Sequence, residues 1–410
     1  MSESFDVIVA GAGVGGGACA LAFAQHGLRV LVLEMRPGPG NINRGTSLLP
    51  AVTRHFRAWG VLDRFYEAGA VPMPGMQVFH HARGLLMEAP FRSDGGHPYL
   101  VLDHPDIERV LAQEGERTGC VTVRYLTRVS GLVREGGRVC GVETVTASGQ
   151  EDRALARLLV GADGAASVVR RLIGLELPAQ PYDSCYFGIN FERPRGYRDG
   201  MRLHLHPDGG MMIVPNRPGM VGAAVLVRPR DRELFRTGSL DDKVAAIRRR
   251  APVLEGVAPL AKNAHLYPLS RAHAPTYRAE GAVLLGDAVH VTHPTGGQGM
   301  TMAIEDGAAL AAHVGPLLAR GDRDASLDAA LAAYERERRP LNAGLLRWSH
   351  VMGMCFGYPG PAADLFRLAA FRLCGSGLGR WIQPHVWKRM GTRPDAPSRR
   401  PTAAAWGSTS

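Results

Sequence analysis

A glycine-rich turn near the N-terminus constrains the fold of this chain more than any other feature. The pattern GxGxxG is formed by Gly11, Gly13 and Gly16. It follows the short apolar run 5–10 (FDVIVA) and precedes a helix-like run, 16–26, and a second apolar run, 28–33 (LRVLVL). Short, continuously apolar runs are typical of strands buried in a parallel sheet. The order of strand, glycine turn, helix and strand therefore predicts a βαβ unit.

The same turn predicts a nucleotide site. Its first glycine permits the tight turn, its second lets the backbone approach a pyrophosphate, and its third lets helix and strand pack closely. The N-terminus of the helix adds free N–H groups and a partial positive charge. Glu34 lies 18 residues after Gly16, where a carboxylate can accept hydrogen bonds from ribose hydroxyls. Because this carboxylate would repel the 2′-phosphate of NADP, the pattern predicts FAD or NAD.

Two later segments also join a short apolar run to glycine and aspartate. Residues 158–160 lead into 161–164 (GADG), and residues 282–285 (AVLL) lead into Gly286 and Asp287. Taken singly, the first segment has an ordinary turn as its alternative and the second an ordinary helix cap.

The motifs together resemble one known family. Residues 163–170 (DGAASVVR) resemble the DGxxSxxR segment of FAD-dependent monooxygenases of the para-hydroxybenzoate hydroxylase type, the group A flavoprotein monooxygenases. Residues 286–290 (GDAVH), with Pro294 and 296–300 (GGQGM), resemble the family's second flavin motif. The resemblance covers about residues 5–345. It implies bound FAD, NADPH or NADH as the reductant, and a flavin C4a-hydroperoxide that transfers one oxygen of O2 to the substrate.

The resemblance also implies roles for individual residues. Asp287 would bind the ribityl hydroxyls, and the side-chain-poor run 294–299 would lie against the isoalloxazine ring. The helix that follows would direct its positive end at N1 and O2 of the flavin. Arg44 resembles the arginine of the loop over the flavin, Arg109 a cofactor-contacting arginine, and Val129 a backbone contact to adenine. A solvated arginine is the alternative for Arg109. The cofactor-binding candidates are Gly11, Gly13, Gly16, Glu34, Arg44, Arg109, Val129, Asp163, Asp287, Pro294, Gly297, Gly299 and Met300.

Two departures from the family pattern bear on the substrate. Thr301 stands where members often carry asparagine, and residues 293–301 are similar to the squalene epoxidase branch. His104 and Pro105 begin a helix where many hydroxylases carry an arginine. We therefore expect a largely apolar aromatic or isoprenoid substrate, hydroxylated or epoxidised, within secondary metabolism. No catalytic base can be named, because a structural role explains each candidate histidine. The candidates are His80, His81, His204, His206, His290 and His293.

The fold class we expect is α/β. It comprises a glycine-rich, doubly wound FAD-binding domain, an inserted and mostly antiparallel substrate-binding sheet, and a helical C-terminal region. Turn signals at 208–210 and 216–219 separate the short strands of the inserted sheet. The expected parts are 1–180 and 276–345 for the two halves of the FAD-binding domain, 181–275 for the substrate sheet, 346–390 for the C-terminal helices, and 391–410 for a disordered polar tail.

Composition limits location and partners. The net charge is +10, but no basic stripe with interleaved aromatic residues indicates nucleic-acid binding. The six cysteines form no CxxC pair and have no metal-ligand spacing, so we expect no metal site and a reduced, cytoplasmic protein. The apolar stretch 352–378 is either a face for peripheral membrane contact or a core-packing or dimer helix. We expect a monomer or homodimer whose partners are O2 and a small apolar molecule.

Three other functions compete with a monooxygenase. A flavin-dependent halogenase needs a lysine in the first part of the chain, but residues 1–242 contain none and no WxWxIP run occurs. A flavin-dependent reductase or dehydrogenase acting on a polyprenyl or quinone-like substrate is compatible with the same motifs. A flavin-binding protein without turnover is disfavoured, because the motifs expected at the flavin ring are complete.

Overall fold

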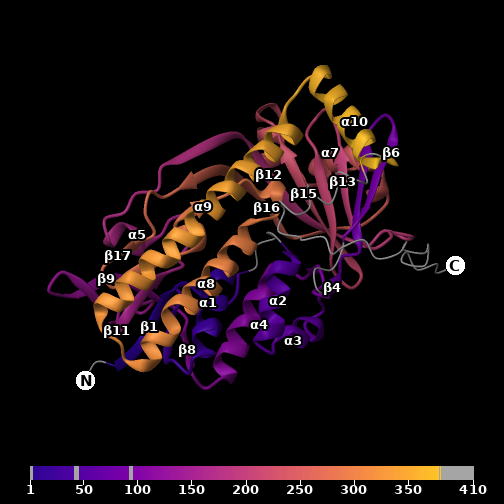
Figure 1. Cartoon of the computed structure of the whole chain (residues 1–410). Helices are drawn as coiled ribbons and strands as arrows, with labels where there is room; N and C mark the ends of the chain where they lie inside the picture. The colour runs from indigo at the N-terminus through magenta and orange to yellow at the C-terminus, as the bar shows by residue number, and fades with distance from the viewer. Residues whose placement is uncertain (1–2, 41–45, 92–95, 378, 380–410) are drawn as a thin grey trace.

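Two eight-stranded sheets organise the computed structural model of this protein (Figure 1). The structure describes residues 3–40, 46–91, 96–377 and 379. The first sheet runs in the order β17 (Arg278–Ala279), β18 (Ala282–Leu284), β11 (Glu151–Gly161), β1 (Glu3–Ala10), β2 (Val30–Leu33) and β8 (Val121–Arg124), extended from β11 by β10 (Arg138–Thr146) and β9 (Thr127–Glu135). Strands β18, β11, β1, β2 and β8 are parallel. The predicted α/β class is confirmed.

The predicted βαβ unit lies at the centre of this sheet. Strand β1 pairs with β2 on one side and β11 on the other, so that Val7 faces Val30 and Leu158. The connecting helix α1 (Val14–Ala24) begins two residues earlier than expected and is buried along almost its whole length. It packs between α4 (His104–Arg117) and α8 (Gly299–Arg320). Helices that cover a parallel sheet bury its strands on both faces, which explains their uninterrupted apolar sequences.

Residues 121–145 alternate like hairpin strands and 135–137 (EGG) is a turn signal, so the sequence predicts a hairpin here, and the structure contains one. Strands β9 and β10 are antiparallel, and Glu135 pairs with Arg138 across a two-residue turn. Both turn residues, Gly136 and Gly137, have positive φ values, 56° and 89°. A two-residue turn of this kind needs positive φ at both positions, which glycine adopts without steric cost.

The second sheet is mostly antiparallel, as predicted. Its order is β19 (His290–Val291), β16 (Pro259–His273), β12 (Ala179–Glu192), β15 (Met220–Val227), β14 (Met211–Arg217), β13 (Met201–Leu205), β5 (Gly75–His80) and β6 (Gly84–Pro90). Two contributions come from outside the predicted range 181–275. Strands β5 and β6 come from the first 180 residues, where β5 pairs in parallel with β13, and β19 follows residue 275 and pairs with β16. The domain boundaries at 180, 275 and 345 stay a prediction.

The two faces of the second sheet have different neighbours. Helices α6 (Arg232–Thr237) and α7 (Leu240–Arg250) cover one face, where Phe187, Phe235 and Ile247 belong to one buried cluster. Alternation along a strand sends successive side chains to opposite faces. Met211 accordingly joins this cluster, whereas Met212 packs on the other face against a cluster that contains Val101.

Smaller elements complete the part of the chain that the structure describes. They are the three-stranded sheet β3 (Ser47–Leu48), β7 (Leu100–Val101) and β4 (Val71–Pro72), the helices α2 (Pro50–Ala58), α3 (Leu62–Glu67) and α5 (Val168–Leu172), and the 3-10 turns η1 (Pro229–Asp231), η2 (Pro252–Leu254), η3 (Gly286–Ala288) and η4 (Pro294–Gly296).

Two helices form the C-terminal region. The long helix α9 (Asp324–Gly357) runs from the first sheet towards the second, where α10 (Pro361–Gly375) lies beside β6 (Figure 1). Helix α10 packs on β6 through Phe371 and Cys374 but leaves Leu365 and Phe366 more than half exposed. No helix among the described residues is long and apolar enough to cross a membrane. The predicted disordered tail, 391–410, lies outside the described residues.

Candidate active site

The carboxyl ends of the parallel strands meet at one edge of the first sheet. The candidate residues at this edge are Gly11 after β1, Glu34 after β2, Asp163 after β11 and Asp287 after β18. Backbone hydrogen bonds join neighbouring strand ends: the Gly11 N–H donates to the Leu33 carbonyl at 2.7 Å, and the Ala162 N–H donates to the Ala10 carbonyl at 2.8 Å. Three segments far apart in the sequence therefore share the edge at which open α/β sheets bind ligands.

The glycines of the first turn face two different surroundings. A Cβ atom at Gly11 would lie 2.5 Å from the Ala162 carbonyl oxygen, and one at Gly16 would lie 1.9 Å from the Gly11 carbonyl oxygen. These two glycines are required by packing within the protein. A Cβ at Gly13 would meet only Glu108, 3.8 Å away, so this glycine faces open space at the N-terminus of α1. The arrangement fits the approach of a pyrophosphate to free N–H groups.

Glu34 is buried and held by a neighbour that the sequence had not singled out. Its carboxylate accepts hydrogen bonds from the Ala12 and Arg36 N–H groups, both at 2.9 Å. The Arg36 guanidinium also contacts Glu34 at 3.0 Å and reaches Glu108 of α4 at 3.2 Å. Burial alone would raise the pKa of Glu34, but the hydrogen bonds and charge of Arg36 and the bond from Ala12 hold it below its ordinary value. Glu34 is thus kept ionised as an acceptor.

The three residues whose cofactor contacts were assigned by resemblance alone, Arg109, Val129 and Arg44, lie in different surroundings. Arg109 lies on α4 with a half-exposed side chain that pairs with Asp106 at 2.6 Å. Val129 is buried in β9, two residues after Thr127, whose N–H donates to the Glu34 carbonyl at 3.0 Å. The backbone at Val129 is therefore close in the chain to the residues around Glu34. Arg44 lies outside the described residues. Cofactor contacts by all three stay predictions.

Asp163 caps a short helix. Its carboxylate accepts the Val168 N–H at 2.6 Å and the Val169 N–H at 3.1 Å, at the start of α5. Arg170, which is buried, donates to the Ala288 carbonyl at 2.8 Å. Within the protein, the motif therefore connects the end of β11 to the turn that contains Asp287, through the Arg170 bond to Ala288. A direct contact of Asp163 with a cofactor stays a prediction.

The second segment forms an open stretch of backbone before α8. Pro294 lies in η4, and Gly297 adopts a left-handed conformation with no atom within 4 Å of an added Cβ. An added Cβ at Gly299 would meet only the Thr292 methyl group, at 3.5 Å. The hydroxyls of Thr292 and Thr301 are buried and have no hydrogen-bond partner among the described residues. Half-buried backbone without side chains at Gly297 and Gly299 fits the flat ring that the resemblance implies. Met300 packs inward on the cluster around Ile304.

A buried carboxylate on α8 supports this segment from behind. Asp306 is fully buried and accepts from His290 at 2.7 Å, Arg338 at 2.8 Å and Asn342 at 2.9 Å. Its contact with the Gly286 N–H, at 3.3 Å, holds the turn that contains Asp287. Burial raises the pKa of Asp306, but its three side-chain donors outweigh burial and lower the pKa to about 2. The sequence analysis did not identify Asp306. The one local signal is that Glu305 and Asp306 stand together in a largely apolar helix.

The second sheet contacts residues 286–300, here called the flavin segment, through aromatic residues. The Tyr186 hydroxyl lies 2.9 Å from the Thr295 hydroxyl, and the Tyr182 hydroxyl lies 2.8 Å from Nδ1 of His350 on α9. The ring of His293 stands edge-on to both tyrosines. Burial lowers the pKa of His293 to about 4, aided by the nearby His350, so its ring is neutral at pH 7. Strand β12 is thus joined directly to the loop before α8.

The six candidate histidines do not form one group. His290 belongs to the Asp306 network and His293 to the aromatic contact, whereas the other four lie on or just after β5 and β13. His80 and His81 approach Asp364 of α10 at 3.0 and 3.6 Å. The Ala82 N–H donates to Nδ1 of His80 at 3.2 Å, so Nε2 carries the proton that bonds Asp364. A hydrogen-bonded anchor for α10 accounts for this cluster.

Comparisons with known proteins agree with this geometry. A family model described as an FAD binding domain matches residues 4–349. Rifampicin monooxygenase of Streptomyces venezuelae is 29% identical over 83% of this chain and 70% of its own length. Kynurenine 3-monooxygenase of Salinispora arenicola is 30% identical over 82% of this chain and 76% of its own length. The crystal structure of pqsL, a probable FAD-dependent monooxygenase from Pseudomonas aeruginosa, has a TM-score of 0.77 at 26% identity and covers 90% of this chain and 99% of that one.

Gly13→Val should abolish tight FAD binding without unfolding the protein. The Cβ position is open in the protein, so the new side chain would occupy the space in front of the α1 N-terminus. We expect FAD affinity to fall at least about tenfold, which corresponds to about 1.4 kcal/mol. The measurement is flavin absorbance retained after gel filtration, with a circular dichroism melt on the same sample.

Gly16→Ala is the matched control, because its Cβ would clash with backbone rather than with a ligand. It should lower the melting temperature as well as flavin content. Unchanged FAD affinity in Gly13→Val would refute the assignment of the first turn.

Asp306→Asn should destabilise the protein by about 3–5 kcal/mol, because the buried Arg338 would lose the carboxylate that it contacts at 2.8 Å and keep only the more distant Glu305, at 3.9 Å. The folded-state pKa is depressed to about 2, so this contribution is fully present above the pKa of about 3.9 in the unfolded chain. It is lost as pH falls from about 4 through about 2. Urea unfolding at pH 7 and at pH 3 measures both effects.

The control for the pH effect is Asp241→Asn, an exposed position on α7. This control should reproduce the acid sensitivity of the wild-type protein, whereas Asp306→Asn should lose part of it. Equal pH dependence in all three proteins would contradict the role given to Asp306.

Proposed function

We propose that this protein hydroxylates a largely apolar aromatic molecule. The chain belongs to the FAD binding domain family and is an FAD-dependent monooxygenase. The observation that carries the proposal is the face of the second sheet turned towards the flavin segment. The Tyr186 contact with Thr295 identifies this face. NADH or NADPH is the proposed reductant.

This face has small residues at its centre and apolar or aromatic residues around them. Gly188 pairs with Ala224, and Ala224 pairs with Met212 on the next strand. Two residues before Gly188 on the same strand, and therefore on the same face, Tyr186 pairs with Tyr267 of β16, and their rings are stacked. A flat apolar molecule can lie over the small residues while the larger side chains enclose its edges.

When bound, FAD would supply the oxygen-activating chemistry, and separate residues of this chain would bind its parts. The glycine turn and the N-terminus of α1 bind the pyrophosphate, Glu34 accepts from the ribose, and Asp287 from the ribityl hydroxyls. The N-terminus of α8 would direct its partial positive charge at the flavin ring and would favour negative charge there. The apolar sheet face orients the substrate and excludes water. No residue is assigned as a catalytic base.

Two of the relatives support an aromatic substrate. A second structure of PqsL, 26% identical to this chain, is a complex with 2-aminobenzoylacetate. A curated relative is named for a reaction on kynurenine. We also propose a cytoplasmic location, supported by the free cysteines Cys19, Cys120, Cys140, Cys185 and Cys355, because free thiols are typical of reducing compartments.

The proposal is tested with the purified, FAD-loaded protein under air. NADH or NADPH is added with a panel of bicyclic and monocyclic aromatic molecules, and oxygen consumption and product mass are measured. We expect one class to accelerate reductant oxidation and to yield a product heavier by one oxygen atom. Substrate reduction or dehydrogenation without oxygen uptake would contradict the proposal and would indicate a flavin-dependent reductase or dehydrogenase instead.

Tyr186→Phe should weaken the coupling of reductant oxidation to product formation and leave FAD binding intact. Removing the hydroxyl leaves the Thr295 hydroxyl without that partner and frees the loop before α8 from β12, at a cost of about 1 kcal/mol. The measurement is product formed per reductant oxidised, beside flavin content. Tyr182→Phe, whose hydroxyl bonds α9 instead of the loop, is the control and should couple better than Tyr186→Phe.

A further inference from the structure

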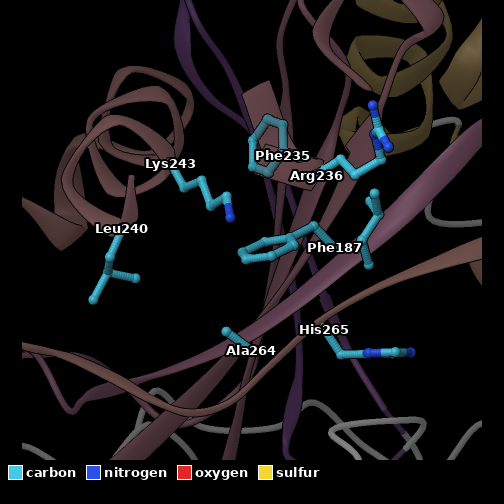
Figure 2. Close-up of a pocket in the computed structure, with 8 residues that line it drawn as sticks. Phe187, Phe235, Arg236, Leu240, Lys243, Ala264 and His265 are labelled. Atoms are coloured by element: carbon cyan, nitrogen blue, oxygen red, sulfur yellow. The ribbon is translucent and has the colours of Figure 1, made fainter. Parts of the chain in front are cut away.

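A cavity lies on the opposite face of the second sheet, beneath α6 and α7. Its volume is about 460 Å³, within the usual range for small-molecule sites. Its walls include Phe187 of β12, Phe235 and Arg236 of α6, Leu240 and Lys243 of α7, and Leu266 of β16 (Figure 2). Because Phe187 and Tyr186 are neighbours on one strand, this cavity and the proposed substrate face lie on opposite sides of the sheet.

The floor of the cavity is aromatic. The rings of Phe187 and Phe235 are 5.1 Å apart between centroids and tilted by 55°, and both side chains are almost fully buried. Sites lined by aromatic side chains favour apolar and aromatic ligands. The floor therefore favours a ligand with an aromatic or other apolar body.

One wall of the cavity carries an uncompensated positive charge. The Lys243 ammonium is 6.0 Å from the centroid of the Phe187 ring and, as Figure 2 shows, extends over the cavity. Among the described residues, no carboxylate oxygen lies within 4.0 Å of this ammonium, whereas the Arg236 guanidinium is paired with Glu233 at 2.7 Å. A cation beside an aromatic floor complements a ligand that joins an anionic group to an apolar ring.

We propose that this cavity is a second binding site, for an aromatic monocarboxylate, with Lys243 as the partner of the carboxylate. The site is separate from the proposed substrate face and requires no chemistry of the flavin. A ligand bound here contacts Phe187, whose neighbour Tyr186 bonds the loop before α8. The proposal goes beyond the monooxygenase reaction and does not depend on the identity of its substrate.

The first test uses the FAD-loaded protein and isothermal titration with 2-naphthoate and its neutral analogue 2-naphthamide. We expect one saturable site for the carboxylate and binding at least about tenfold weaker for the amide. Lys243→Gln should weaken 2-naphthoate binding by a similar factor. Arg249→Gln, which removes an exposed charge from the same helix, is the matched control and should bind like the wild-type protein.

A second test locates the ligand without any substitution. The chain has three lysines, Lys243, Lys262 and Lys388, so limited acetylation followed by peptide mass spectrometry resolves each of them. We expect 2-naphthoate to slow acetylation of Lys243 relative to the other two. Equal affinity for the amide, unchanged binding in Lys243→Gln, or no selective protection of Lys243 would each overturn the proposal, as would absence of binding up to about 10 mM.

Discussion

The buried carboxylate of Asp306 holds together the part of the protein on which the candidate site depends. It joins α8 to α9 through Arg338 and Asn342, and it joins both helices to the turn before His290. A buried anion is tolerated only where donors replace its lost hydration. The four donors around Asp306 meet this requirement, and the turn that contains Asp287 is thereby given one position relative to the N-terminus of α8.

The same turn is held from the other side by Arg170, whose guanidinium donates to the Ala288 carbonyl. The DGxxSxxR segment and the second flavin segment are therefore mechanically connected, although more than a hundred residues separate them. The second sheet is added to this frame through Tyr186 and Thr295. One strand, β12, consequently faces the flavin segment with Tyr186 and a separate cavity with Phe187.

Local patterns predicted local structure well. The turn around Gly13, the hairpin at Gly136 and the start of α8 each depend on residues close together in the chain, because glycine conformation and apolar periodicity act over short distances. The strands β5 and β6 were missed as members of the second sheet, since their partner β13 lies more than a hundred residues away. No local signal indicates such a pairing.

The sequence by itself determined the βαβ unit, the order of the three motifs and, through their resemblance to a family, FAD-dependent oxygenation. These follow from short patterns whose geometry is set by backbone sterics and strand burial. Only the tertiary structure decided that Asp306 of α8 pairs with Arg338 of α9, that Arg36 bridges Glu34 and Glu108, and that Lys243 lies over an aromatic floor. These contacts join side chains from separate elements, and their distances exist only once both sheets and their helices have packed together.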